Sequence, residues 1–504
     1  MGGGVSFYVK LIAPVVIGFI TYFIAWNLGG FGLSMNAWLY ASIFLALIIA
    51  LILEPIPAAL IGVIGITVAA LLKVGPVGSG VDGAVIKPAA AINWALSGFS
   101  NAVVWLIFAA FTIGVGFSKT GLGARLALFL VSKLGKSTLG LGYAIGIVDG
   151  ILAPFIPSNA ARSGGTIFPV VSSISTMFGS TPENAPRKIG AYLVWTGLAT
   201  ACVSSSIFLT GQAPNPLALS LLHDQGVKVV DWSGWFIAFA PVGLILFLIT
   251  PLMCYLIYPP EIKGSAEVVK WAKEESKKLG KITTKEILMI VICLIGLVLW
   301  VGASVFGINA TTTALLVIVL MCASGVITWQ DFLSNKPAWS TLVWFATLVA
   351  MAAGLKNVGY LDWAGEIIKI WLKEFDTFWA MLILLLTFHL MRYLFASGTA
   401  YVTALIAIYV TLANAVSGLD VAQTMLILCL PMGFMGIITP YGTGCSPLWY
   451  GSHYISSPTF FKLGAIFALI YMAIYMLVGI PWVNFIAPYL TLFGDKILLT
   501  PNLI

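Results

Sequence analysis

Two short polar motifs interrupt long apolar stretches of this chain, and their side chains are the ones best suited to binding a charged ligand. The first motif is Ser158-Asn159-Ala160, and the second is Ser397-Gly398-Thr399. Each is followed, at a comparable distance, by a segment that reads T-G-x-x-P, namely Thr210–Pro214 and Thr443–Pro447. In a membrane protein, Gly- and Pro-interrupted hydrophobic segments at corresponding places of two halves indicate a binding site near the middle of the bilayer.

The residues around the first motif predict a helix start that attracts anions. Pro157 precedes Ser158 and Asn159, either of which can cap a helix, and the backbone N–H groups after the cap are left free. The second motif offers a break of the same kind. A helix N-terminus carries about half a positive charge, so two such ends facing each other would supply about one charge. A ligand with two negative charges would then keep about one charge to be compensated.

Three basic side chains in apolar surroundings are candidates for this compensating charge. Arg162 lies shortly after the first motif, whereas Arg392 and His389 lie shortly before the second. Arginines inside a membrane are costly and are retained for function or in ion pairs. The sequence leaves alternatives open for each candidate. Arg162 can form a structural pair with Asp149, Arg392 can extend to the membrane surface, and His389 can fill a purely structural position.

The T-G-x-x-P segments add hydroxyl and backbone groups to the same predicted site. Thr210 and Thr443 supply hydroxyls, while Gly211 and Gly444 let a ligand approach the backbone closely. Each proline interrupts its helix and frees carbonyl groups, which in broken membrane helices line substrate or ion sites. A plain kinked helix is the alternative that these residues leave open.

The composition places these motifs in an integral membrane protein. Of the 504 residues, 60% are hydrophobic and 9% are charged, whereas soluble domains carry about 25% charged residues. The net charge of +7 is modest and does not indicate a nucleic-acid partner; in a membrane protein it reports cytoplasmic loops rich in Lys and Arg. The six cysteines are scattered, so we expect neither a disulfide framework nor a metal site, and no cofactor.

Enzymatic and channel functions find little support in the sequence. It contains no H-E-x-x-H zinc motif, no G-x-S-x-G nucleophile elbow and no close pair of intramembrane aspartates. We therefore do not expect an intramembrane enzyme. Channels are commonly built as rings of charges or carbonyls, which a pair of broken segments does not suggest.

The chain divides into four segments by composition and internal likeness. We expect residues 1–54 to form leading transmembrane segments, and residues 55–258 and 287–504 to be two copies of one unit. Residues 259–286 between them are rich in Lys and Glu, which predicts a cytoplasmic linker or an amphipathic helix on the membrane surface.

The fold class predicted from this organisation is an all-α polytopic membrane protein. Both copies contain a glycine pair that encloses a lysine, Gly116 to Gly121 and Gly354 to Gly359, each followed by an amphipathic segment. More apolar stretches precede Trp105 in the chain than lie between the Lys-rich linker and Trp344, as an inverted repeat with one extra leading span would give. We expect about eleven transmembrane helices, with the two polar motifs on two re-entrant hairpins.

Around these motifs the sequence resembles the divalent anion/sodium symporter family, in particular its exchanger branch. The resemblance rests on Pro157–Gly165, on Thr439–Gly444, and on the Tyr450-Gly451-Ser452 and Tyr454-Ile455-Ser456 segments that follow. Family members carry a Ser-Asn-Thr signature in each half. The likeness extends from about residue 35 to residue 490. The exchanger branch includes plastid 2-oxoglutarate/malate translocators and bacterial citrate/succinate antiporters.

The resemblance implies an elevator-type transporter with scaffold and transport domains, usually a homodimer, in a bacterial plasma membrane. It implies that Ser158, Asn159, Ser397 and Thr399 contact the substrate. Ala160 lacks the expected hydroxyl, and Gly398 replaces the second asparagine, so side-chain oxygens that help build the sodium sites of the symporters are missing. The expected function is therefore sodium-independent exchange of C4/C5 dicarboxylates such as 2-oxoglutarate, succinate and malate; the alternative is sodium-coupled dicarboxylate symport.

Overall fold

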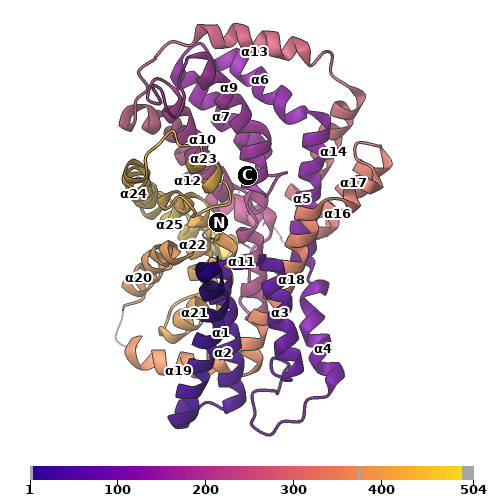
Figure 1. Ribbon diagram of the computed structural model, residues 1–504, viewed down its shortest axis with the longest axis vertical. Helices are drawn as coiled ribbons and strands as arrows, with labels where there is room; N and C mark the ends of the chain where they lie inside the picture. Colours follow the sequence, from indigo (N-terminus) through magenta and orange to yellow (C-terminus); the bar gives the residue numbers. More distant parts are fainter. Residues whose placement is uncertain (1–3, 373–375, 396, 491–504) are drawn as a thin grey trace. The chain divides into compact units, whose positions relative to one another are not determined.

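Helices account for the regular structure of the computed structural model, which describes residues 4–372, 376–395 and 397–490 (Figure 1). Within these ranges no β-strand occurs, and Ser137 and Gly264 form an isolated β-bridge. The helices pack into two compact units, each assembled from separate stretches of chain. The first unit comprises residues up to Phe108, Leu217–Val229 and Pro337–Leu428; the second comprises Ala109–Pro216, Val230–Lys336 and the residues from Cys429 onward.

The helices differ widely in length, and short 3-10 or π segments, labelled η, join several of them. The first unit contains α1 (Gly4–Asn27), η1 (Gly29–Gly32), α2 (Met35–Leu53), α3 (Ala58–Leu71), α4 (Pro88–Leu96), η2 (Ser97–Ser100), α19 (Tyr360–Leu372), α20 (Thr377–Leu390), η5 (Met391–Leu394) and α21 (Gly398–Ala415). Four helices cross a boundary between the units, namely α5 (Ala102–Thr120), α11 (Pro214–Asp224), α18 (Lys336–Asn357) and α22 (Val421–Cys429). The second unit contains α6 (Leu122–Leu134), α7 (Thr138–Leu152), α8 (Asn159–Arg162), η3 (Ser163–Ile167), α9 (Phe168–Met177), α10 (Gly190–Ile207), η4 (Leu209–Gly211), α12 (Trp232–Ile257), α13 (Ala266–Lys278), α14 (Thr284–Val301), α15 (Ala303–Phe306), α16 (Ala310–Ala323), α17 (Trp329–Leu333), η6 (Leu430–Met432), η7 (Phe434–Ile438), α23 (Ser446–Gly451), α24 (Ser457–Ile474), η8 (Tyr475–Gly479), α25 (Ile480–Ile486) and η9 (Ala487–Tyr489).

Ten helical segments among the described residues are long and apolar enough to cross a membrane. This confirms the predicted all-α polytopic class, whereas the count of eleven stays a prediction. The α7 helix, in the first expected hairpin, has 15 residues and is too short to count among the ten. In the second expected hairpin, α21 and the run of α20 and η5 both reach 18 residues and count among the ten.

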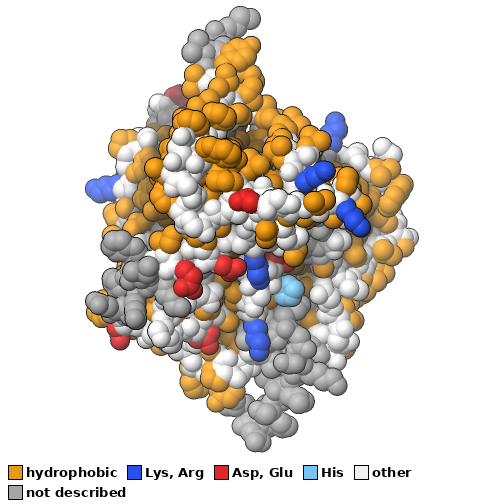
Figure 2. Space-filling model, turned by 90° about the horizontal axis from the view of Figure 1, so that it is seen from below, with side chains coloured by type: hydrophobic (Ala, Val, Ile, Leu, Met, Phe, Trp, Pro, Cys, Tyr) orange, Lys and Arg blue, Asp and Glu red, His pale blue; other side chains and the backbone are white. Residues whose placement is uncertain are grey.

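The surface of the protein is rich in hydrophobic side chains, as a membrane-embedded chain requires. On the face drawn in Figure 2, hydrophobic side chains are widespread and charged ones are few. Only 11% of the apolar window of α1 is buried, and large side chains such as Phe19 and Phe23 are exposed along it. By contrast, 94% of α10 is buried, because its many Gly, Ala, Ser and Thr residues let neighbouring helices approach from every side.

Two corresponding corners of the chain have the same local structure. Gly121 has a φ of 74° and precedes α6, and Gly359 has a φ of 79° and precedes α19. Both helices have 13 residues. Glycine populates this left-handed conformation without the penalty of a Cβ. Such likeness is what a duplicated unit would produce, and the inverted direction of the copies stays a prediction.

The charged segment between the two predicted copies contains the amphipathic helix α13, which packs against α6 in the second unit (Figure 1). Val268 and Ala272 of α13 are fully buried. Arg125 of α6 donates to both oxygens of Glu286 at the start of α14, at 2.5 and 3.2 Å, and to the carbonyl of Gly280 at 3.0 Å. The helix is therefore held by apolar packing and by an arginine that bridges its end to α14.

Candidate functional site

The first polar motif lies at a break between two helices of the second unit. After α7 ends, the chain turns through Pro154 and Pro157 and starts α8, which continues through the π segment η3 into α9. Ser158 is the N-cap, and its side chain accepts a hydrogen bond from the N–H of Ala161 at 3.2 Å. The predicted helix start at the first motif is thus confirmed, with Ser158 rather than Asn159 as the cap.

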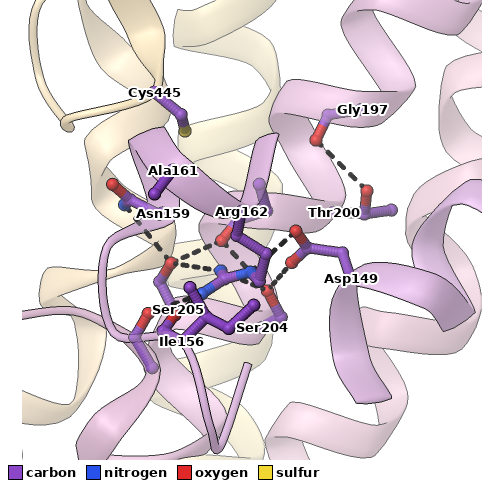
Figure 3. A network of polar contacts seen from close by, with 12 residues as sticks. Asp149, Ile156, Asn159, Ala161, Arg162, Gly197, Thr200, Ser204, Ser205 and Cys445 are labelled. Carbon is purple, nitrogen blue, oxygen red and sulfur yellow. Dashed lines mark hydrogen bonds and ion pairs between the residues drawn. The ribbon is translucent and has the colours of Figure 1, made fainter. Parts of the chain in front are cut away.

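Arg162 lies at the centre of a polar network just after this cap (Figure 3). A guanidinium has five N–H donors, and each has an acceptor here. Nε donates to Oδ1 of Asp149 at 2.8 Å. The remaining four donors reach acceptors at 2.7–3.3 Å, namely the carbonyls of Ile156 and Gly211 and the hydroxyls of Ser204 and Ser205.

The ion pair between Arg162 and Asp149 is completely buried, with 0% of either side chain exposed. Ser204 donates its hydroxyl to Oδ2, the other oxygen of Asp149. The sequence allowed Arg162 either to compensate substrate charge or to pair with Asp149. The structure contains the pair with Asp149. While this pair is intact, the positive charge of Arg162 is balanced inside the protein.

Asn159 connects the first motif to the second T-G-x-x-P segment. Its Nδ2 donates to the hydroxyl of Thr443 at 2.6 Å and, more weakly, to Ser205 at 3.4 Å. Gly444 lies against the other end of the amide, because a Cβ built on it would stand 2.8 Å from Oδ1 of Asn159. Two segments far apart in the sequence thus meet at one amide side chain.

The first T-G-x-x-P segment is bonded to the same hairpin. The hydroxyl of Thr210 donates to the carbonyl of Pro154 at 2.7 Å and accepts the indole N–H of Trp232 at 3.1 Å. The carbonyl of Gly211 accepts from Arg162. The chain is a short 3-10 turn here, followed by α11 from Pro214, so the helix is interrupted rather than merely kinked.

The second polar motif belongs to the first unit and also starts a helix. Ser397 is the N-cap of α21, with its hydroxyl 3.5 Å from the N–H of Ala400 and 2.8 Å from the hydroxyl of Thr399. Gly398 is the first residue of α21. The prediction of a second small-residue break that opens a helix is confirmed.

The other two basic candidates lie close to the second motif in the sequence, and both are buried. Arg392 is 1% exposed, so its side chain is enclosed by protein, and its place relative to the membrane surface stays a prediction. Its guanidinium carbon lies 5.2 Å from the ring centre of Tyr401, within cation–π range. His389 is also 1% exposed, and its Nε2 pairs with the carbonyl of Leu428 at 3.1 Å.

The structure gathers eight of the predicted site residues in the second unit. They are Ser158, Asn159, Ala160, Arg162, Thr210, Gly211, Thr443 and Gly444. Ser397, Gly398, Thr399, Arg392 and His389 belong to the first unit. That the two motifs share one chamber stays a prediction.

Sequence reasoning missed Ser204 and Ser205 of α10, which complete the network around Arg162. A signal for them exists, since three consecutive serines, 204–206, stand near the end of a largely apolar segment. Among the described residues, no three His, Cys, Asp or Glu side chains form a group that could hold a metal ion.

Comparison with known proteins gives consistent similarities over most of the chain. The family model of the sodium:sulfate symporter transmembrane region matches residues 6–488. The chain is 40% identical over 482 residues to the citrate/succinate antiporter of Escherichia coli strain K12, covering 94% of this chain and 97% of that protein. It is 38% identical over 457 residues to the L-tartrate/succinate antiporter of Shigella sonnei, covering 90% and 93%.

Solved structures are similar in fold. One of them is the YdaH transporter of Alcanivorax borkumensis, with a TM-score of 0.54 over 87% of this chain and 98% of that chain. The two sequences are 12% identical, so this likeness concerns the arrangement of helices alone.

Proposed function

Since the chain belongs to the family of the sodium:sulfate symporter transmembrane region, it is a membrane transporter and not an enzyme, and we propose that it exchanges C4/C5 dicarboxylates across the membrane. The observation that carries the proposal is the identity of 38–40% to antiporters whose names include succinate, over at least 90% of the chain. Succinate, malate and 2-oxoglutarate are the proposed substrates, and a bacterial plasma membrane is the proposed location.

The local structure of the motifs supports a role in binding carboxylates. Ser158 and Ser397 each cap a helix that starts with small residues, and the N-terminal end of a helix carries partial positive charge. Asn159 and Thr443 add an amide and a hydroxyl that are bonded to each other beside Gly444. The two N–H groups of Asn159 are taken by Ser205 and Thr443, and the Thr443 hydroxyl retains a proton that it can donate to a carboxylate.

Sodium-independent exchange is proposed over symport because of two side chains that the sequence lacks. Ala160 has no hydroxyl and Gly398 has no amide, and oxygens are the ligands that hard cations require. Arg392 and His389 are kept as candidates for compensating substrate charge in the first unit. The alternative, sodium-coupled symport, would have to rely on backbone carbonyls at the helix breaks.

An elevator movement of a transport domain against a scaffold is part of the proposal, together with a homodimer and an inverted repeat of residues 55–258 and 287–504. Moving an unneutralised charge through the membrane interior costs several kcal/mol. A carrier whose empty site keeps a positive charge would therefore return slowly without substrate. That asymmetry would make one dicarboxylate leave for each one that enters.

The test is transport by the purified protein in liposomes that contain either unlabelled succinate or buffer alone. We expect labelled succinate to accumulate only in succinate-loaded liposomes, equally with sodium or potassium outside, and unlabelled malate or 2-oxoglutarate to compete with it. Sodium-dependent uptake into buffer-loaded liposomes would replace exchange with symport. Uptake that these diacids leave unchanged would overturn the proposed substrate class.

A further inference from the structure

Asp149 belongs to none of the sequence motifs, yet its side chain is fully buried beside the first of them. It lies in the last turn of α7 with 0% of its side chain exposed. A buried carboxylate without a partner is very costly, and the C-terminal end of a helix, where the partial charge is negative, raises that cost further. Both of its oxygens accept hydrogen bonds, Oδ1 from Arg162 and Oδ2 from Ser204.

The partner of Asp149 has no donor left for a ligand. Each of the five N–H groups of Arg162 meets an acceptor of the protein itself. The guanidinium joins α8 to four other segments, namely α7, the turn before α8, η4 and α10, and so fixes their relative positions. The net charge of the pair is zero, since one buried cation faces one buried anion.

The network continues from the ion pair to the first motif through two serines of α10. Ser204 bonds both members of the pair. Ser205 donates to the carbonyl of Ala201 at 2.6 Å, which leaves its oxygen to accept from Arg162 at 3.3 Å and from Asn159 at 3.4 Å. Ser205 and Thr443 thus accept from the two N–H groups of the Asn159 amide. Figure 3 shows Asn159 and Ser205 beside Arg162.

We infer that Asp149 is a positioning residue of the transport site: it neutralises Arg162 and so keeps the arginine bonded to Ser205, the serine that helps to fix the Asn159 amide. The inference rests on the proposed function, because it concerns how the same site binds a dicarboxylate. It assigns Arg162 an internal role and leaves the compensation of substrate charge to groups outside this pair.

The test compares Asp149→Asn with the double variant Asp149→Asn/Arg162→Gln in succinate exchange by liposomes. Asp149→Asn keeps the shape of the side chain but leaves the guanidinium charge buried and unpaired, so we expect KM to rise at least about tenfold. Adding Arg162→Gln removes that charge, and KM should move back toward the wild-type value. Lys278→Gln, which breaks the exposed pair with Glu275, is the control and should exchange like the wild type.

The opposite role for Arg162 gives the opposite pattern. An arginine that compensates substrate charge would be freed by Asp149→Asn, so KM would be unchanged or lower, and adding Arg162→Gln would abolish exchange; either result overturns the inference. If Asp149→Asn cannot be recovered folded, a folded and exchanging double variant supports the inference, and an unfolded or inactive one overturns it. A wild type that exchanges no dicarboxylate refutes the proposed function instead.

Discussion

Gly444→Ala is the smallest change that should disturb the contact between the first polar motif and the second T-G-x-x-P segment. The added Cβ would stand 2.8 Å from Oδ1 of Asn159 and 3.6 Å from the Cβ of Ala160. Ordinary contacts between such atoms exceed about 3.4 Å, near the optimal separation of non-bonded heavy atoms. The amide of Asn159 must therefore turn away, and its 2.6 Å hydrogen bond to Thr443 is weakened or lost.

The magnitude follows from two terms. Loss of a buried hydrogen bond costs about 1 kcal/mol, and overpacking by one methyl group costs about 1–3 kcal/mol. If about 1.4 kcal/mol of this free-energy cost weakens the binding of the substrate, its affinity decreases about tenfold. We expect the KM for succinate exchange in liposomes to rise by that factor or more, with a smaller effect on the maximal rate.

Gly165→Ala is the matched control for this substitution. Gly165 lies in the same hairpin, and no atom stands within 4 Å of a Cβ built on it. Alanine also favours helix over glycine by about 1 kcal/mol, so this variant should be as stable as the wild type and exchange at the same KM. If Gly444→Ala has the same KM as Gly165→Ala, the Asn159 amide does not contribute to substrate binding and the reasoning fails.

Three further predictions concern the second unit. Thr443→Val keeps the side-chain shape but removes the hydroxyl that accepts from the first motif, so KM for succinate should rise about tenfold, or ~1.4 kcal/mol; an unchanged KM argues against the contact. Arg125→Gln leaves the Glu286 carboxylate, 3% exposed, without its cation, which should cost about 2 kcal/mol or more and lower the unfolding temperature in detergent; an unchanged temperature contradicts this. Hydrogen bonds from Lys119 and the Thr328 backbone lower the pKa of Asp331 to about 2. Because the folded pKa lies below the unfolded value near 4, the ionised Asp331 stabilises the fold above about pH 4, and this stabilisation is lost as the pH falls toward 2. The difference in unfolding temperature between the wild type and Asp331→Asn should therefore shrink from pH 4 to pH 2.

The membrane class and the helix breaks could be predicted from the sequence because they depend on local composition. Ser158 and Ser397 precede small residues inside apolar stretches, and both cap helices in the structure. The segments Thr210–Pro214 and Thr443–Pro447 were predicted to be breaks, and neither lies within a continuous helix. Each of these predictions concerns the residues next to one another in the chain.

Partners in space could not be predicted in the same way. The sequence left Arg162 free to pair with Asp149 or to compensate substrate charge, and only the burial of both side chains shows the pair. Ser204 and Ser205 come from a different helix, and their facing of Arg162 depends on how α10 packs. The enclosure of Arg392 by protein, which leaves it 1% exposed, likewise depends on packing.

The most direct test of dicarboxylate exchange is the release of labelled succinate from liposomes that contain the purified protein. With buffer alone outside, the account predicts that the label stays inside, because the carrier does not return empty. Addition of unlabelled succinate, in sodium-free medium, should release it promptly. Release at the same rate with and without external dicarboxylate would contradict exchange as the function of this protein.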